Sequence, residues 1–448
     1  MAFYLGLAGL SIAWLGLGRR LASARPPSLR QLWAVAALWS APLVAGPVLF
    51  SHDVYSYLAQ GEILHLGMNP YREPPLLLGV LGHPHLLAAV SPFWRDTTAP
   101  YGPLFMTAAG AIVASTGSHL IAGVLALRAL DLGGMILVAW FVPRLARALG
   151  ADPLRATWLT VASPLVLLEL VAAAHNEALM VGLMVAGVTL AVTGRPLPAI
   201  ALCALAATVK LPGAVALAFV AASWAWSCRD RLRALAASVL TASVVVLAVS
   251  ALAGVGLSWA SGSLFSTPQK VHLAITPATG LGWTLAAGLR ALGLAVSAGA
   301  LESAVAAIAL VALVSLTAVS LWRTRPETMV RDLGLVLVAA ALCGPAAWPW
   351  YLTWGTVLLA AVPSLQRSPA LPAAALASVF VVKADGILAL HLSSAPAVVA
   401  VYAVLATVAW RARVRRGGRS GRAARHPAAA ARVPAASDAA PSALVQSR

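Results

Sequence analysis

The sequence predicts an all-α, polytopic membrane protein. Of its 448 residues, 60% are hydrophobic and only 10% are charged, and the mean hydropathy is +0.87. A soluble domain cannot bury that much apolar surface. Apolar runs separated by short polar joints recur along nearly the whole chain, and their lengths predict about thirteen transmembrane helices.

The expected spans follow these apolar runs in order. They lie near residues 2–18, 31–50, 119–143, 154–172, 177–194, 197–211, 213–227, 234–255, 301–322, 332–347, 351–364, 370–387 and 394–411. The run 278–296 fits either a further span or a helix at the membrane interface. The run Leu104–Ser115 is too short to span comfortably, and we expect an interfacial helix there.

The positions of Lys and Arg predict the orientation in the membrane. All but seven of the 31 cationic residues fall on one side of the expected topology. Cytoplasmic loops carry such an excess, so the long loop 51–118 is expected on the outer face. We expect residues 1–411 to form the membrane domain and the basic segment 412–448 to be a disordered cytoplasmic tail. The net charge of +17 therefore requires no nucleic acid partner.

The most informative polar stretch runs from Ser51 to Gly61, where the apolar run Leu32–Phe50 ends. It places Asp53 at the mouth of a span in a chain with only 14 acidic residues. Such a placement predicts chemistry at the membrane surface, and the alternative is an ordinary polar helix cap. Further candidates in this loop are His52, Tyr55, Tyr57, Gln60, Asn69 and Tyr71.

Two more groups lie at expected outer junctions. His175-Asn176-Glu177 separates two apolar runs, although Glu177 also fits a helix cap, because carboxylates are favoured in a first turn. Lys210 has no acidic residue nearby in the sequence. It is either a snorkelling side chain or the partner of a phosphate.

The remaining candidates are cationic or aromatic. Lys270 and His272 lie in the expected outer loop 256–277. Arg128 stands one turn from Asp131 in an apolar run, and the two fit an ion pair as well as a substrate site. The aromatic residues Trp348, Trp350 and Tyr351 fit either an interfacial belt or a wall that stacks on sugar.

Together these positions describe a site for an anionic, lipid-linked substrate and a polyol acceptor. The sequence contains no Walker loop, dinucleotide fingerprint, zinc-protease motif or nucleophile elbow, and its three Cys residues show no metal-site spacing. The alternative is a transporter or flippase for a lipid-linked sugar, and a third possibility is a membrane scaffold without activity.

Several short blocks resemble one known family. They are S-H-D-V-Y-S-Y-L-A-Q-G from residue 51, G-M-N-P-Y from 67, A-P-Y-G-P from 99, A-H-N-E-A-L-M from 174, K-L-P-G from 210, S-T-P from 266 and W-P-W-Y from 348. In this order they look like the polyprenol-phosphomannose-dependent α-1,6-mannosyltransferases, MptB-like, of the glycosyltransferase C superfamily. The resemblance runs from about residue 31 to 410. The Ala- and Arg-rich composition fits an actinobacterium with a high GC content.

The resemblance implies an inverting enzyme that transfers mannose from polyprenyl-phosphate mannose to a mannan or lipomannan acceptor, at the outer face of the plasma membrane. Asp53 matches the family's loop acid, which is expected to act as the base. Lys210, Arg128, and Lys270 with His272 are the expected phosphate partners. The hydroxyl-contact candidates are Tyr55, Tyr57, Gln60 and Asn69, and Trp348 and Trp350 are expected to stack on sugar or guide the prenyl chain. No metal or other cofactor is expected.

Overall fold

The computed structural model describes residues 2–260, 276–344 and 347–380. Every regular element in these ranges is a helix, which confirms the all-α prediction. The longer helices are α1 (Ala2–Arg20), α2 (Leu29–Ala45), α3 (Asp53–His65), α5 (Pro103–Thr116), α6 (Leu120–Ala148), α9 (Glu177–Val192), α10 (Pro196–Ala207), α11 (Pro212–Ser227), α12 (Arg231–Leu252), α14 (Pro277–Ala291), α15 (Ala298–Arg323), α16 (Met329–Cys343) and α19 (Ala370–Val379).

Shorter helices connect these elements. The α-helical ones are α4 (Pro84–Ala89), α7 (Pro153–Leu159), α8 (Pro164–Val166), α17 (Thr353–Leu359) and α18 (Pro363–Gln366). The others are η1 (Pro75–Gly79), η2 (Pro92–Trp94), the π-helical η3 (Leu167–Ala172), η4 (Ser258–Ala260) and η5 (Pro349–Leu352). Many begin with proline, which suits a first helical position because the amide hydrogen missing there has no partner within the helix.

The apolar runs form fewer long helices than their lengths predict. Within the described ranges, α6, α12 and α15 are long and apolar enough to cross a membrane, and α7 with α8–η3, bent by 45°, forms a fourth candidate. Prolines divide several runs, because proline removes a helical hydrogen bond and starts a new element. In the expected span 351–364, for example, α17 ends at Leu359 and Pro363 begins the separate helix α18. The run 394–411 lies outside the described residues, as do residues 381–387 of the run 370–387.

The outer surfaces of two long helices are apolar. None of the most apolar part of α15 is buried inside the protein, and only 17% of that of α12 is. Leu240 and Val244 of α12, like Ile308 and Val311 of α15, are exposed. Such an extensive apolar surface is suited to contact with lipid. These helices therefore indicate a membrane protein.

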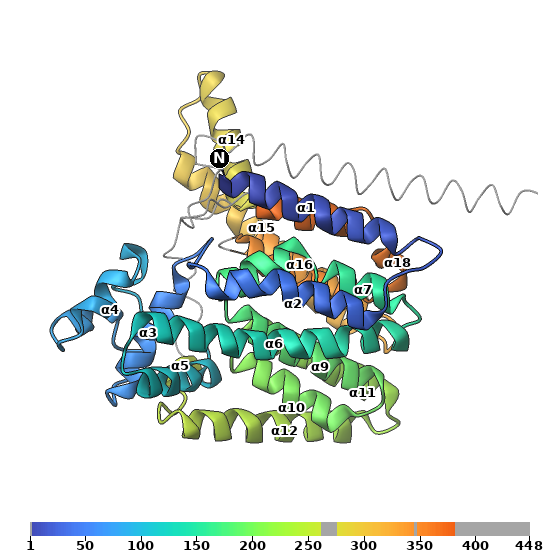
Figure 1. Cartoon of the computed structure of the whole chain (residues 1–448), viewed down its shortest axis with the longest axis horizontal. Coiled ribbons are helices and arrows are strands. Elements are labelled where there is room, and N and C mark those ends of the chain that lie inside the picture. The colour runs from blue at the N-terminus through green and yellow to red at the C-terminus, as the bar shows by residue number, and fades with distance from the viewer. Residues whose placement is uncertain (1, 261–275, 345–346, 381–448) are drawn as a thin grey trace, which may run out of the picture.

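Figure 1 shows α2, α6, α9 and α10 running side by side, while α3, α4 and α5 gather at one end of the bundle. The close crossing of α6 and α9 depends on glycine. A Cβ at Gly134 would meet the backbone of Ala178, and one at Gly182 would meet the backbone of Gly134. Small residues allow helices in membranes to approach in this way. This packing fixes the start of α9, which carries part of the site.

The elements of the loop 51–118 are helical and packed. The expected interfacial helix 104–115 is α5, which buries Phe105 and Ala109. It approaches α3 at Gly61, where a Cβ would meet the backbone of Ala109. The run 278–296 forms the 15-residue helix α14, which packs against α15.

Candidate functional site

Asp53 opens α3 at the end of the bundle where the elements of the long loop gather. Its backbone N–H donates to Ser51 Oγ at 3.1 Å, and its side chain is 17% exposed. Trp94, from η2 of the same loop, lies near the carboxylate and favours its charged form. Burial raises the pKa of Asp53, although the charges of His175 and Lys210 oppose this rise. A carboxylate with a raised pKa is a stronger base than an ordinary surface Asp.

His175 lies between η3 and α9 and faces Asp53. Its Nε2 is 3.8 Å from Asp53 Oδ2, and its side chain is fully buried. Its Nδ1 donates to the main-chain carbonyl of Glu169 at 2.6 Å. The A-H-N-E block therefore comes together with the Asp53 block, over 100 residues earlier in the sequence.

An aromatic wall, formed by Trp348, Trp350 and Tyr351, adjoins this pair. His175 stacks on Trp350 with ring centroids 4.0 Å apart, and Trp350 stacks on Trp348 at 4.8 Å. Tyr351 stands edge-on to Trp350. The contact with His175 places the wall in the candidate site, where its rings provide stacking surfaces.

Lys210 contacts this site from the turn before α11. Its Nζ donates to Glu177 Oε1 and lies 5.6 Å and 5.0 Å from the ring centres of Tyr101 and Tyr351. The interpretation of Lys210 as a cation without an acidic partner is therefore wrong, because folding brings Glu177 beside it. The Lys210 side chain is 15% exposed, whereas that of Glu177 is fully buried.

The end of the long loop docks directly beside Lys210. The backbone N–H of Gly102 donates to the carbonyl of Val209 at 2.9 Å, and that of Leu104 donates to the carbonyl of Thr208 at 3.0 Å. A Cβ at Gly102 would collide with the backbone of Thr208. The A-P-Y-G-P and K-L-P-G blocks thus form one structural unit that presents Tyr101 to Lys210.

Arg128 does not fit its expected role as a phosphate partner. The side chain is 1% exposed, and its two terminal nitrogens donate to four main-chain carbonyls, those of Val44, Gly46, Pro47 and Ala172, at 2.7–3.0 Å. It also forms no ion pair with Asp131, although both residues are described. Arg128 instead joins the ends of α2 and η3, which lead into Asp53 and His175.

The remaining candidates in the loop 51–118 have mixed surroundings. His52 is exposed and Tyr55 is half-buried, whereas Tyr57 packs edge-on against Tyr101 and Phe105 at 4.9 Å. Asn69 donates to Ser258 Oγ at 2.9 Å and accepts from the Tyr71 backbone N–H at 3.0 Å. These bonds favour a structural role for Asn69. Tyr71 is buried, which raises its pKa.

Two amide side chains have unused hydrogen-bonding groups. Gln60 and Asn176 are buried, and neither side chain has a hydrogen-bond partner within the described part of the chain. Buried polar groups are normally paired. These amides are therefore available to a substrate or to water.

Three contributors were missed in the sequence. Trp94 contacts Asp53, Tyr101 lies over Lys210, and the Glu169 carbonyl holds His175. Trp94 and Tyr101 belong to proline-containing blocks of the long loop, and Glu169 is a lone acid in an apolar run. Position 169 contributes its main-chain carbonyl, which every residue carries, so no side-chain pattern predicts that contact. Lys270 and His272 lie outside the described residues.

The described ranges contain no group of three or more His, Cys, Asp or Glu residues arranged to hold a metal ion. The absence of a metal requirement stays a prediction.

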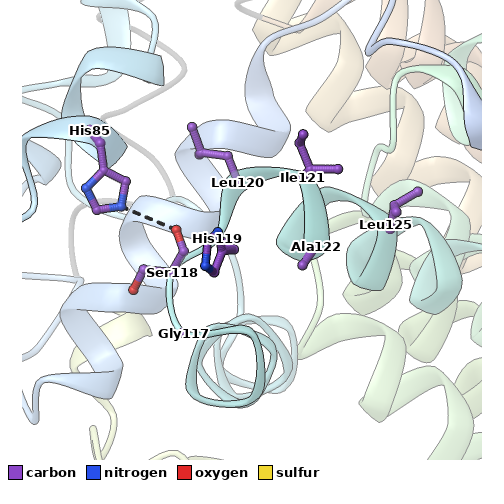
Figure 2. A pocket seen from close by; sticks show the side chains of 8 residues that line it. All are labelled: His85, Gly117, Ser118, His119, Leu120, Ile121, Ala122 and Leu125. Atoms are coloured by element: carbon purple, nitrogen blue, oxygen red, sulfur yellow. Dashed lines mark hydrogen bonds between the residues drawn. The ribbon is translucent and has the colours of Figure 1, made fainter.

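A separate pocket of about 810 Å³ opens where α5 meets α6. Figure 2 shows His85 pointing across it toward the α5–α6 turn, where its Nε2 lies 3.3 Å from the carbonyl oxygen of Ser118. It is lined by His85, Gly117, Ser118, His119, Leu120, Ile121, Ala122 and Leu125. None of the predicted site residues lines this pocket, so we place the site at Asp53.

The geometry defines a helical membrane protein with a polar, aromatic-walled site at one end of its bundle. A family model described as alpha-(1->6)-mannopyranosyltransferase, N-terminal domain, matches residues 1–226, and one described as MptB C-terminal domain matches residues 274–415. The chain belongs to this MptB-like mannopyranosyltransferase family, which confirms the resemblance. No solved structure matches it.

Three relatives illustrate the similarity. Alpha-(1->6)-mannopyranosyltransferase A of Mycobacterium tuberculosis is 36% identical over 379 residues, or 81% of this chain and 71% of the relative. A probable alpha-(1->6)-mannopyranosyltransferase of Mycolicibacterium smegmatis is 35% identical, covering 80% of this chain and 69% of the relative. Alpha-(1->6)-mannopyranosyltransferase B of Corynebacterium glutamicum is 30% identical, covering 80% of this chain and 65% of the relative. These organisms fit the expected actinobacterial origin.

Proposed function

We propose that this chain is an inverting α-1,6-mannosyltransferase that uses polyprenyl-phosphate mannose as its donor. The observation that carries the proposal is the convergence of Asp53, His175 and Lys210 beside one aromatic wall. A base, a cation and a stacking surface are the groups that sugar transfer from a lipid phosphate requires. Family membership and the relatives' names support the choice of mannose and of the α-1,6 linkage.

In the proposed reaction, Asp53 removes the proton from the acceptor's 6-hydroxyl as that oxygen attacks C1 of the donor mannose. Attack occurs opposite the phosphate, so a β-linked donor gives an α-linked product. The C1–O bond to the phosphate breaks, and the phosphate leaves with the electron pair. Phosphate is already a good leaving group, and Lys210 is the cation that stabilises its charge.

The aromatic wall and the unpaired amides provide the binding surfaces in this proposal. The wall formed by Trp348, Trp350 and Tyr351 stacks on sugar or guides the prenyl chain. Gln60 and Asn176 provide hydrogen-bond donors and acceptors for sugar hydroxyls. The acceptor is a mannan or lipomannan chain of the lipomannan and lipoarabinomannan backbone type.

The transfer itself is the direct test of this function. Membranes containing the chain are incubated with labelled polyprenyl-phosphate mannose and a short α-1,6-mannoside. We expect a labelled product one mannose longer. A transporter or flippase would move the labelled lipid across the bilayer without forming this product, and that result would contradict the proposal.

We further propose that the site faces the outside of the plasma membrane, within a membrane domain of residues 1–411 that has about thirteen spans including bent and short ones. The basic tail 412–448 is cytoplasmic in this proposal, in line with the excess of Lys and Arg on that side. On the outer face, the lipid-linked donor is accessible but cytoplasmic nucleotide sugars are not.

Cysteine labelling tests this orientation. Single cysteines replace Glu73 or Ser420 in a background without Cys203, Cys228 and Cys343. On intact cells, an impermeant maleimide is expected to label only the Glu73→Cys variant, whereas both variants react after permeabilisation. Labelling of the tail alone, or equal labelling of both before permeabilisation, would contradict the proposed orientation and with it the choice of donor.

A further inference from the structure

The two ring nitrogens of His175 have different surroundings. Nδ1 lies 2.6 Å from the Glu169 carbonyl oxygen. Because a carbonyl only accepts hydrogen bonds, Nδ1 carries a hydrogen, and in the neutral ring Nε2 carries the lone pair. That nitrogen is buried, has no hydrogen-bond partner in the described part of the chain, and faces Asp53 Oδ2 across 3.8 Å.

The local backbone explains why this carbonyl is available. In the π-helical η3, the N–H of Ala173 donates to Leu168, five residues earlier, and so bypasses Glu169. Ala174 then adopts a left-handed conformation, with φ of 56°. This conformation is strained for a residue other than glycine. The reversal ends the helix and directs the next side chain, His175, back onto the Glu169 carbonyl.

Packing fixes the plane of the imidazole. The ring stacks on Trp350 with an interplanar angle of 29° and is fully buried. With one nitrogen anchored and one face covered, His175 has little freedom to turn Nε2 away from Asp53. The arrangement holds an acceptor nitrogen in front of the carboxylate.

We propose that His175 is a positioning residue for Asp53 and that its Nε2 receives the proton which Asp53 takes from the acceptor. The inference rests on the proposed function and adds a destination for that proton. The acceptor O–H bond breaks, the proton passes through the Asp53 carboxyl to Nε2, and the new O–C1 bond forms as the bond to phosphate breaks. The imidazolium releases its proton to water when the product leaves.

The charged groups around the ring suit this cycle. Burial lowers the pKa of His175, so the ring is neutral before the reaction. The charges of Glu177 and Asp53 raise its pKa, whereas Lys210 lowers it. Asp53 comes from α3, Glu177 from α9, and Lys210 from the turn before α11. Two acidic neighbours against one cation stabilise an imidazolium once it has formed.

Two substitutions separate the roles of the two nitrogens. His175→Asn retains a donor near the Nδ1 position and removes the nitrogen that faces Asp53. His175→Gln places an amide near the Nε2 position and removes the anchor to Glu169. The control is His85→Asn, which changes an exposed histidine outside the Asp53 cluster.

We expect His175→Asn to remain folded but to lose about a hundredfold in kcat, within the range of general-base assistance. The KM for donor is expected to stay within about threefold, because His175 acts through Asp53. The acidic limb of the pH profile is expected to move to higher pH, because the charge of His175 holds the pKa of Asp53 down and is then missing. His175→Gln is expected to be similarly impaired, since an amide is a poor proton acceptor.

Near wild-type kcat in His175→Asn, or full activity in His175→Gln, would overturn the proposal. So would a loss of kcat with an unchanged acidic limb, because that is the result of a purely structural role. Infrared pH-difference spectra of the Asp53 carboxyl stretch, assigned with Asp53→Asn, test the coupling without turnover. Its titration midpoint is expected to rise in His175→Asn, because His175 no longer lowers the pKa of Asp53, and an unchanged midpoint would refute the inference even if wild type transferred no mannose.

Discussion

Asp53→Asn is expected to abolish mannose transfer while leaving the protein folded and inserted in the membrane. Asparagine preserves the shape of the side chain but cannot accept the acceptor's proton. General-base assistance contributes about a hundredfold to ten-thousandfold to a rate, so kcat should fall by at least about a hundredfold. The donor KM is expected to change little, because the lost interaction acts in the transition state.

The matched control is Asp96→Asn, which neutralises an exposed acid of the same loop. It should retain wild-type activity and expression. Activity of Asp53→Asn within about tenfold of wild type would remove Asp53 from the role of base, since the assistance would then be too small.

The wild-type enzyme should also show an acidic limb in its pH profile. Burial raises the pKa of Asp53 above the ordinary value for an Asp side chain. The carboxylate is therefore present at pH values above this raised pKa and is lost as the pH falls through it. Activity should therefore be lost as the pH falls through this raised pKa.

The second large effect is expected when Lys210 is removed. A charge-assisted bond to phosphate contributes roughly 1.5–3 kcal/mol. Its loss should lower kcat/KM for the donor by about tenfold to more than a hundredfold. The direct change Lys210→Met is ambiguous, however, because it leaves the buried Glu177 without its partner. Breaking a buried pair on one side destabilises a protein by about 3–5 kcal/mol.

A background that neutralises Glu177 separates these two effects. Glu177→Gln keeps the ammonium and is expected to retain donor binding, whereas Glu177→Gln with Lys210→Met removes both charges and should still fold. The double variant is expected to show the lower kcat/KM for the donor described above. Donor titration at saturating acceptor measures it. If its donor kinetics match those of Glu177→Gln alone, Lys210 serves only the ion pair.

From the sequence we could predict which segments form the site, but not which contacts their side chains make. Polar blocks at the ends of apolar runs identified Asp53, His175-Asn176-Glu177, Lys210 and Trp350, and the fold brings these residues together. The reason is that each block interrupts a long apolar run, and the interruptions gather at one end of the helical bundle.

The contacts of Lys210 and Arg128 depend on tertiary packing instead. Glu177 is 33 residues from Lys210, so no local pattern predicts their pairing. The spacing of Arg128 and Asp131 on α6 suggested a local pair, yet Arg128 bonds to carbonyls of α2 and η3. Unsatisfied carbonyls at helix ends are strong acceptors, and only the folded chain shows which of them lie within reach.

The most direct measurement is mannose transfer by the purified full-length chain in proteoliposomes, with wild type and Asp53→Asn prepared side by side. Labelled polyprenyl-phosphate mannose is supplied together with a short α-1,6-mannoside, and the anomeric configuration of the product is determined. The account predicts an α-linked product one mannose longer from wild type and none from Asp53→Asn. Equal product from both proteins, or movement of the labelled lipid across the bilayer without any product, would contradict it.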